Sequence, residues 1–494
     1  MAFTRTPMES TDQTKDIPLL QQWQSRDAAG LKDVESINVV WDVVNDPVEP
    51  YHVAIKREGL SPFPVSLPPS ELYGSFFWKT STAPLLVFIG AFGTWVINAQ
   101  TGAFVGNDPS VVFSNNIIGR TVFKFEDGTE KLIITDGANL VSMDETGIMV
   151  TITDPDRPVT HRPYPVYLDG YLFLADDKGN IANSDYNNPA SWSTSNFINA
   201  EAYPDKLLAL ARHGVYIVAF GEDSIQFFYD AANPTGTPLA VYGASSPQIG
   251  FRGGLAEYGD TLIFTAVANN GQINVYSLEG FKANIIGTST VSRRLDTYLS
   301  TGTFIRSGHL LEINGHSLYT WADFSTSSPQ PLDSVWAVDL ETKLWTKLEA
   351  FGLTSFPIRT SVLVENNSQF YTFVSFSGTV QPFRFLPIVY RDNGIDFRMQ
   401  FTTKNYDFGT RRMKFGARLI VSADQTPTSS NCTISWSDDD YQTFSTPRPV
   451  DLSGTYTQLY ALGKFRKRAF RVNYTGNFPM RFTKLELDYS QGQA

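Results

Sequence analysis

The feature that most constrains the fold of this chain is a pair of short apolar segments that recurs along it. Both segments of each pair are bounded by turn residues, which is typical of β-strands rather than helices. A spacing of about 40–50 residues with several short strands per unit indicates a β-propeller. The pairs begin near Leu85, Leu132, Tyr171, Val215, Thr261, His309 and Phe370, at intervals of 47, 39, 44, 46, 48 and 61 residues.

One unit can be followed almost whole between His309 and Leu348. The segments HLLEI, SLYTW, SVWAVDL and KLWTKL predict four strands, the last two joined by a tight turn at Glu341–Thr342. A single four-stranded blade cannot cover both of its apolar faces, so neighbouring blades stack and close a ring. Residues 85–390 can hold six or seven such blades, and an early strand such as Ile37–Val44 could return to complete the ring. Helical periodicity is scarce, with candidates over 16–29 and, more weakly, 206–211.

The pattern changes at about Arg391, where the paired repeat stops. At least five further strand-like segments follow, which favours an antiparallel β-sandwich. Residues 391–494 carry 15 Lys and Arg against 10 Asp and Glu, a net charge of +5, within a chain of net charge −11. The first 390 residues therefore carry −16. We predict an all-β protein: an N-terminal arm with a short helix (1–35), a six- or seven-bladed β-propeller body (36–390) and a basic sandwich or platform domain (391–494).

Composition excludes several classes of function. One cysteine, Cys432, cannot form an intrachain disulfide or a zinc cluster, and no two of the five histidines have HxxxH spacing. The net negative charge argues against a protein that coats nucleic acid with its whole surface. We expect neither a signal peptide nor a membrane span, because no apolar run is long enough.

The candidate catalytic motifs are better explained as structure. Ser437–Phe444 resembles an Asp-box, SxDxGxxW, with Tyr441 in place of the glycine and Phe444 in place of the tryptophan. A hairpin turn held by aspartate side chains is favoured over the two alternatives, a cation site and a catalytic role. The pairs Asp154/Asp156 and Asp176/Asp177 also lie at turn positions. Cys432 alternates with apolar residues, as a buried strand cysteine does. We expect no catalytic residues, no cofactor and no metal.

A basic run near the C-terminus is the strongest candidate site. It comprises Lys464, Arg466, Lys467, Arg468 and Arg471, and a second cluster that could join the same face comprises Arg411, Arg412 and Lys414. Three interpretations stay open at this point: a strand edge guarded by charge, an interface with an acidic neighbouring subunit, or contact with phosphate.

The segment from Ile181 to Val291 carries a family resemblance. It contains a W-S-x…F element, the strand PDKLLAL, the hairpin VAFG–EDSIQFF, a loop rich in Thr, Pro, Gly and Ser, and IGFRGGL before a further hairpin. The order of these elements resembles the tail hub or nozzle proteins of short-tailed bacteriophages, also called packaged DNA stabilisation proteins. RKRAFRVNYTGNFPMRFTKLELDY near the C-terminus is similar to the end of that family, and REGLSPFP (57–64) loosely resembles its N-terminal R-x-G-x-x-x-F-P segment.

The resemblance implies a structural virion protein without enzymatic activity. Members of that family form a ring of six copies below the portal and head-to-tail adaptor, and they contact tail fibre, tailspike or needle proteins. They retain packaged DNA and let it pass without sequence-specific binding. The protein would be assembled in the host cytoplasm and located in the virion tail. The alternatives are a sialidase-like propeller glycoside hydrolase acting on surface polysaccharide, and a generic propeller scaffold that binds proteins. The loop 231–250 is expected to face the channel or an adjoining subunit, with these residues as candidates: Asn233, Thr235, Tyr242, Ser245 and Ser246.

Overall fold

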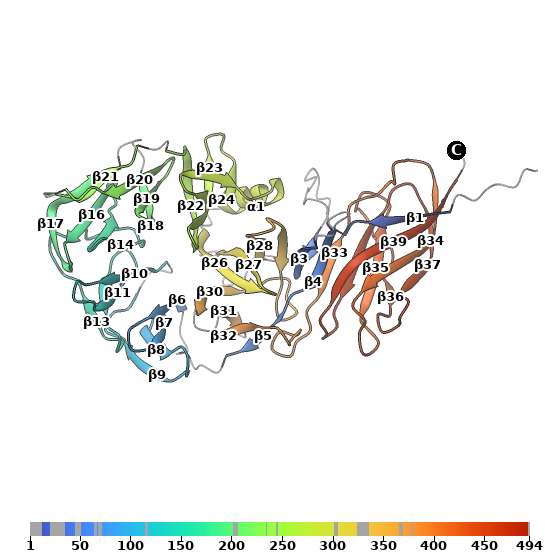
Figure 1. Cartoon of the computed structure of the whole chain (residues 1–494), viewed down its shortest axis with the longest axis horizontal. Coiled ribbons are helices and arrows are strands. Elements are labelled where there is room, and N and C mark those ends of the chain that lie inside the picture. Colours follow the sequence, from blue (N-terminus) through green and yellow to red (C-terminus); the bar gives the residue numbers. More distant parts are fainter. Residues whose placement is uncertain are drawn as a thin grey trace, which may run out of the picture.

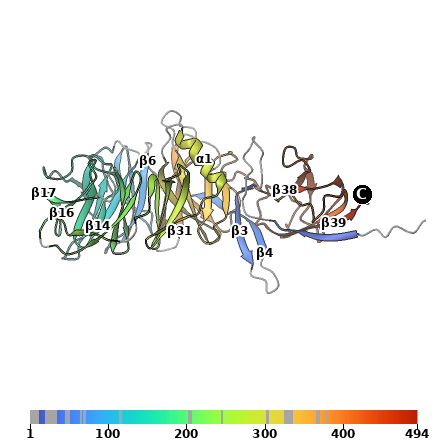
Figure 2. The same ribbon diagram turned by 90° about the horizontal axis from the view of Figure 1, so that it is seen from above.

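A computed structural model of the chain describes residues 12–19, 35–44, 51–63, 67, 72–113, 117–200, 206–233, 235–243, 246–300, 305–323, 335–364, 369–376 and 379–492. Within these ranges the regular secondary structure is β-strand apart from one helix, α1 (Ser289–Ser300). A ring of strands occupies one side of the molecule, and the C-terminal strands lie beside it (Figures 1 and 2). In the described residues, no helix has the length and apolar character needed to cross a bilayer.

The ring contains seven antiparallel four-stranded units in the described part of the chain (Figure 1). This number is the upper of the two blade counts predicted from the repeat. Five of the units are separate sheets, and the fifth and sixth units are parts of one 13-stranded sheet that continues into the C-terminal strands. The first four units comprise β6 (Leu72–Lys79), β7 (Pro84–Gly90), β8 (Gly93–Asn98) and β9 (Phe104–Asp108); β10 (Gly119–Lys124), β11 (Glu130–Thr135), β12 (Leu140–Met143) and β13 (Met149–Thr151); β14 (Val166–Leu168), β15 (Tyr171–Ala175), β16 (Asn180–Asp185) and β17 (Asn188–Asn199); and β18 (Leu207–His213), β19 (Tyr216–Gly221), β20 (Ile225–Asp230) and β21 (Leu239–Val241). The last three comprise β22 (Ile249–Tyr258), β23 (Thr261–Ala268), β24 (Ile273–Glu279) and β25 (Lys282–Ile285); β26 (Ile305–Ile313), β27 (His316–Asp323), β28 (Val335–Asp339) and β29 (Trp345–Leu348); and β30 (Ile358–Val364), β31 (Gln369–Phe376), β32 (Thr379–Leu386) and β5 (Gly59–Pro62).

Apolar contacts between successive units hold the ring together. One buried cluster joins Phe123 and Ile133 of the second unit to Leu172 and Leu174 of the third, and similar clusters join each later pair. In the first five units the second strands are buried on both faces, because each unit lies between two others. This explains why segments such as PLLVFIG are apolar without alternation.

The ring is closed by β5, a strand that precedes the first unit in the sequence. β5 pairs with β32, Leu60 opposite Phe385, and supplies the fourth strand of the last unit. That unit packs against the first one, where the Ser75 and Thr360 hydroxyls are 3.0 Å apart. The expectation that Ile37–Val44 completes the ring was therefore wrong. This segment forms β2 (Ser36–Ile37), which lies beside the ring strand β29 without closing the ring, and β3 (Val39–Val44), which pairs with β4.

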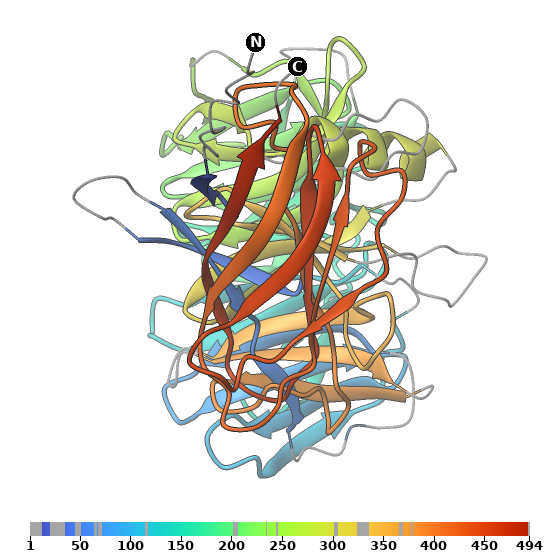
Figure 3. The same cartoon turned by 90° about the vertical axis from the view of Figure 1, so that its right-hand side faces the viewer.

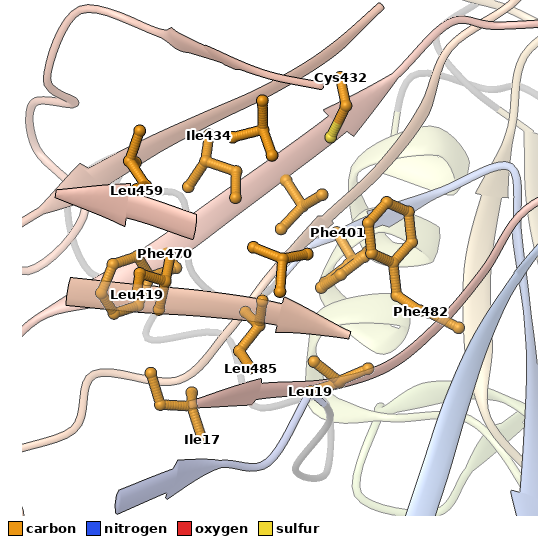
Figure 4. Close-up of a cluster of buried hydrophobic side chains, with 14 of the residues drawn as sticks. Ile17, Leu19, Phe401, Leu419, Cys432, Ile434, Leu459, Phe470, Phe482 and Leu485 are labelled. Carbon is orange, nitrogen blue, oxygen red and sulfur yellow. The ribbon is translucent and has the colours of Figure 1, made fainter. Parts of the chain in front are cut away.

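The C-terminal strands form two layers that share a core (Figures 3 and 4). In one layer, β2 pairs with β29 of the ring and with β33 (Met399–Thr402), and the sheet continues through β38 (Ala469–Tyr474), β35 (Cys432–Ser437) and β36 (Arg448–Val450). The other layer has the order β3, β4 (Tyr51–Lys56), β39 (Arg481–Gln491), β34 (Lys414–Ala423) and β37 (Gln458–Phe465), and β1 (Asp12–Ile17) also pairs with β39.

Several local predictions need correction. Residues 36–44 and 51–56, which we assigned to the propeller body, belong to the C-terminal layers: β2 pairs with β33, β4 pairs with β39, and β3 pairs with β4. Residues 206–211 are not helical: the segment belongs to β18, whose apolar side chains are buried between two units. The helix expected over 16–29 lies mostly outside the described residues, and its first two positions end β1. The helix α1 was not anticipated.

Candidate assembly surface and its supporting contacts

The basic run lies where β37 ends, at the edge of the six-stranded layer. The side chains of Lys464 and Arg466 are exposed, as are those of Arg411 and Arg412 in the segment before β34. Arg466 Nη1 donates a hydrogen bond to the Arg411 carbonyl oxygen at 3.0 Å, which brings the two predicted basic clusters together. Within the described part of the chain, no carboxylate forms an ion pair with any of these four side chains. They form an uncompensated basic edge, defined by Arg411, Arg412, Lys464 and Arg466.

Arg468 belongs to the interior rather than to this edge. Its side chain is 1% exposed, and its Nε and Nη2 donate to the two carboxylate oxygens of Asp438, both at 2.7 Å. Its guanidinium also lies over the Phe465 ring, 4.3 Å from the centroid. A bidentate pair of this kind fixes a planar guanidinium in one orientation, so Arg468 supports the fold.

Lys414 is also buried, although we grouped it with the exposed cations. Its Nζ donates to the backbone carbonyl oxygens of Thr410, Arg412 and Arg466 at 2.6, 3.1 and 2.8 Å. Burial lowers the pKa of Lys414. Lys414 therefore ties together the two chain segments that present the basic edge, and it is itself inaccessible to a partner.

The acidic motif beside this edge is a structural turn, as predicted. Asp439 accepts hydrogen bonds from the Thr443 hydroxyl and backbone N–H and from the Ser437 hydroxyl, which lower its pKa to about 2. Asp438 pairs with Arg468, and Asp440 pairs with Lys467. Asp440 and Tyr441 have φ of 61° and 67°, so Tyr441 adopts the left-handed conformation that glycine supplies in the Asp-box. The remaining basic residue, Arg471, stacks on Phe444 at 3.5 Å.

A buried polar cluster that sequence reasoning missed joins the ring to the C-terminal layers. Arg57 donates to both carboxylate oxygens of Asp392, at 2.9 and 2.6 Å, and to the Glu349 carbonyl oxygen at 2.6 Å. Asp392 also accepts the backbone N–H of Leu60 in β5. The segment R-x-G-x-x-x-F-P begins at Arg57, and it was the one sequence pattern that pointed to this cluster. Its function is structural, since Arg57 holds Asp392, which in turn anchors β5, the closing strand.

Lys56 occupies the next position and is equally buried. Its Nζ donates to the carbonyl oxygens of Tyr390, which follows the ring, and Gly476, in the loop between β38 and β39, at 3.2 and 2.6 Å. Its ammonium lies 4.3 Å from the centroid of the Phe397 ring. Burial is the largest influence on this group and, with the adjacent Arg57, it lowers the pKa of Lys56 to about 7.

The loop 231–250 lies around β21, the last strand of its unit and the outer one in Figure 1. The Asn233 side-chain amide donates to the Thr237 and Leu239 carbonyl oxygens, which closes the hairpin. Tyr242 stacks on Phe281 at 4.7 Å and contacts Tyr216. Thr235 is exposed and Ser246 half-buried, while Ser245 lies outside the described residues. Whether this outer loop contacts an adjoining subunit stays a prediction.

The other candidate groups occupy structural positions. Asp154 and Asp176 cap turns by accepting backbone N–H groups two residues ahead, each at 2.8 Å, as expected of turn aspartates. Cys432 is buried in β35, where desolvation raises its pKa to about 12. In the described residues, no three His, Cys, Asp or Glu side chains gather as a metal site would require.

Comparison with known proteins matches part of the chain to a phage family. The family described as bacteriophage P22 Gp10, beta-propeller, matches residues 102–304, a range that contains the segment on which the resemblance was based. The match supports a relationship to phage tail proteins with a β-propeller. No curated protein matches the chain.

Two solved structures align with about two thirds of this chain. The WD40 domain of Neurospora crassa Pan2 is 8% identical, with a TM-score of 0.41, over 67% of this chain and 95% of that one. A chain of a mitotic checkpoint complex is 11% identical, with a TM-score of 0.38, over 67% of this chain and 94% of that one.

Proposed function

We propose that this protein is a structural subunit of a phage tail. The observation that carries the proposal is the family match over residues 102–304, which lies on the ring of four-stranded units. In the finer form of the proposal, the chain forms the hub or nozzle ring below the head-to-tail adaptor, retains packaged DNA and provides the conduit for its ejection. It would act without enzymatic chemistry, as a virion component assembled in the host cytoplasm.

The distribution of charge supports assembly between copies of the chain. The exposed basic edge lies on a region of net charge +5, and the preceding residues carry −16. Complementary potentials steer association and set its register, although exposed ion pairs contribute little energy individually. We infer that the basic edge contacts the acidic ring body of a neighbouring copy. The ring body would also repel DNA phosphates, which suits a conduit.

The sialidase-like alternative gains no support from the Asp-box turn. Its carboxylates are engaged by Arg468, Lys467 and Thr443, and it lies in the C-terminal layers rather than in the ring. A protein-binding scaffold is the remaining alternative.

Mass photometry and negative-stain microscopy of the purified full chain would test the proposal. We expect a closed ring of several copies that co-purifies with portal and adaptor proteins. A monomer that releases sugars from bacterial polysaccharide would contradict it, and a monomer that binds unrelated proteins would favour the scaffold.

A further inference from the structure

The N-terminal strand β1 is held by one edge of β39. It pairs antiparallel with that strand from Asp12 opposite Ser490 to Ile17 opposite Leu485, and it extends the six-stranded layer (Figures 1 and 3). β4 occupies the same edge of β39 only at Arg481 and Phe482. The 485–490 edge therefore depends on β1 to complete its backbone hydrogen bonds, and without β1 it would be an open site for strand addition.

Two side chains anchor this segment in the shared core. Ile17 and Leu19 are 1% and 3% exposed and lie beside Leu485 and Leu419 (Figure 4). The side chains of residues 13–16 are exposed. The docked segment thus resembles a bound peptide, with backbone pairing along β39 and two apolar anchors at one end.

Polar contacts match this segment specifically to β39. The Thr14 hydroxyl donates to Asp488 at 2.6 Å, and the Tyr489 hydroxyl donates to the Gln13 side-chain oxygen at 3.0 Å. Lys484 forms an ion pair with Asp16 at 3.0 Å. The site on β39 is thereby complementary to residues 13–19 of this sequence, which every copy of the chain carries.

The connection to the rest of the chain permits a second arrangement. Residues 20–34 separate Leu19 from Glu35, and a segment of that length can span up to about 50 Å when fully extended. A neighbour's strand would make the same contacts as the chain's own, so exchange between adjacent copies changes the contact energy little.

We propose that in the assembled ring residues 12–19 of one copy occupy the 485–490 edge of the next copy. The exchanged strand links each subunit to its neighbour and makes the ring a continuous chain of strand donors and acceptors. This inference rests on the proposed ring assembly and identifies the segment that joins its subunits.

Paired cysteines test the exchange in the full-length protein. Thr14 and Asp488 are directly opposite in the register, where Cα atoms lie about 4.5–5.5 Å apart, a separation suited to a disulfide. The variant carrying both Thr14→Cys and Asp488→Cys is oxidised after assembly and denatured without reductant. We expect a ladder of covalent oligomers, whereas linkage within each chain gives a monomer band that shifts only on reduction. The chain's own cysteine, Cys432, is buried, and the unsubstituted protein treated in the same way shows any disulfide that this cysteine forms.

Two further measurements keep the result interpretable. Co-expression of a Thr14→Cys chain with a differently tagged Asp488→Cys chain should give a disulfide-linked heterodimer, which cannot form without exchange. If the first pair disturbs folding, Asp16→Cys with Glu486→Cys occupies the next outward-facing register. A closed ring that yields only intrachain disulfides would overturn the exchange and leave the proposed function intact. Failure of the unsubstituted chain to form a ring would instead overturn the proposed function.

Discussion

Arg57 and Asp392 form an ion pair in which both side chains are completely buried, with Nη2 and Oδ2 2.6 Å apart. Arg57 follows β4 of the C-terminal layers and precedes β5 of the ring, and Asp392 follows the last ring strand. The Phe351 N–H also donates to Asp392, at 3.1 Å. One carboxylate therefore holds together three segments that are distant in the sequence, at the junction where the ring closes.

Replacing Asp392 by Ala should destabilise the protein strongly. The change leaves the Arg57 guanidinium buried without its charged partner, and breaking such a pair costs about 3–5 kcal/mol. Chemical denaturation of both proteins would measure the loss. The matched control is Asp396→Ala, which removes a neighbouring but exposed pair with Arg391 and should cost less than about 1 kcal/mol. Equal effects at the two positions would contradict the structural role of Asp392.

Lys56 should make stability depend on pH above neutrality. Its folded pKa of about 7 is well below the ordinary value of 10.5, so the unfolded chain binds more protons between these values. The free energy of unfolding therefore rises with pH across this window, by about 2 kcal/mol between pH 7 and 9. Well below pH 7, Lys56 is protonated in both the folded and the unfolded chain and adds no pH dependence. Unfolding titrations of the wild type and Lys56→Met at several pH values would isolate the effect, because the variant lacks the titrating group. Parallel pH profiles for the two proteins would count against it.

Gly59→Ala should disrupt closure of the ring. A Cβ at this position would lie inside van der Waals contact of the Arg391 backbone carbonyl, which cannot move without shifting the chain that carries Asp392. We expect a loss of about 1–3 kcal/mol, measured by thermal or chemical unfolding. Gly454→Ala is the control, since a Cβ there meets no atom within 4 Å. A Gly59→Ala protein as stable as the control would show that β5 tolerates displacement.

The basic edge should affect assembly without affecting the fold. Lys464→Glu with Arg466→Glu reverses two exposed charges, so we expect ring formation to weaken at low salt, and the difference from the unsubstituted protein to shrink at high salt, where the repulsion is screened. The unfolding free energy should change by less than about 1 kcal/mol. Mass photometry and denaturation measure the two quantities separately.

Arg468→Met changes a buried basic residue of the same run, so we expect it to affect stability rather than the exposed edge. It leaves Asp438 without its bidentate partner and should lower stability by more than the double reversal does. Normal assembly by the Lys464→Glu, Arg466→Glu protein would remove the basic edge from the proposed interface.

The basic run shows which side-chain positions the local sequence predicts and which it does not. The sequence groups Lys464, Arg466 and Arg468 in one basic run, and the first two side chains do face solvent. β37 ends at Phe465, however, and the chain bends at 466–467 before Arg468 pairs with Tyr406. The bend turns Arg468 inward toward Asp438, a residue 30 positions away. Nothing in the spacing of the basic residues marks that bend.

The repeated strand pairs were sufficient to predict stacked four-stranded units, and the Asp-box pattern was sufficient to predict the Asp439 turn, because both depend on neighbours within a few tens of residues. Tertiary structure alone decided that β5 closes the ring, that β2, β3 and β4 join the C-terminal layers, and that Arg57 meets Asp392. These choices depend on which strand edges and buried charges find partners hundreds of residues away. Two apolar strands can have similar sequences, and which of them fills a given edge depends on which edges the rest of the folded chain leaves unpaired.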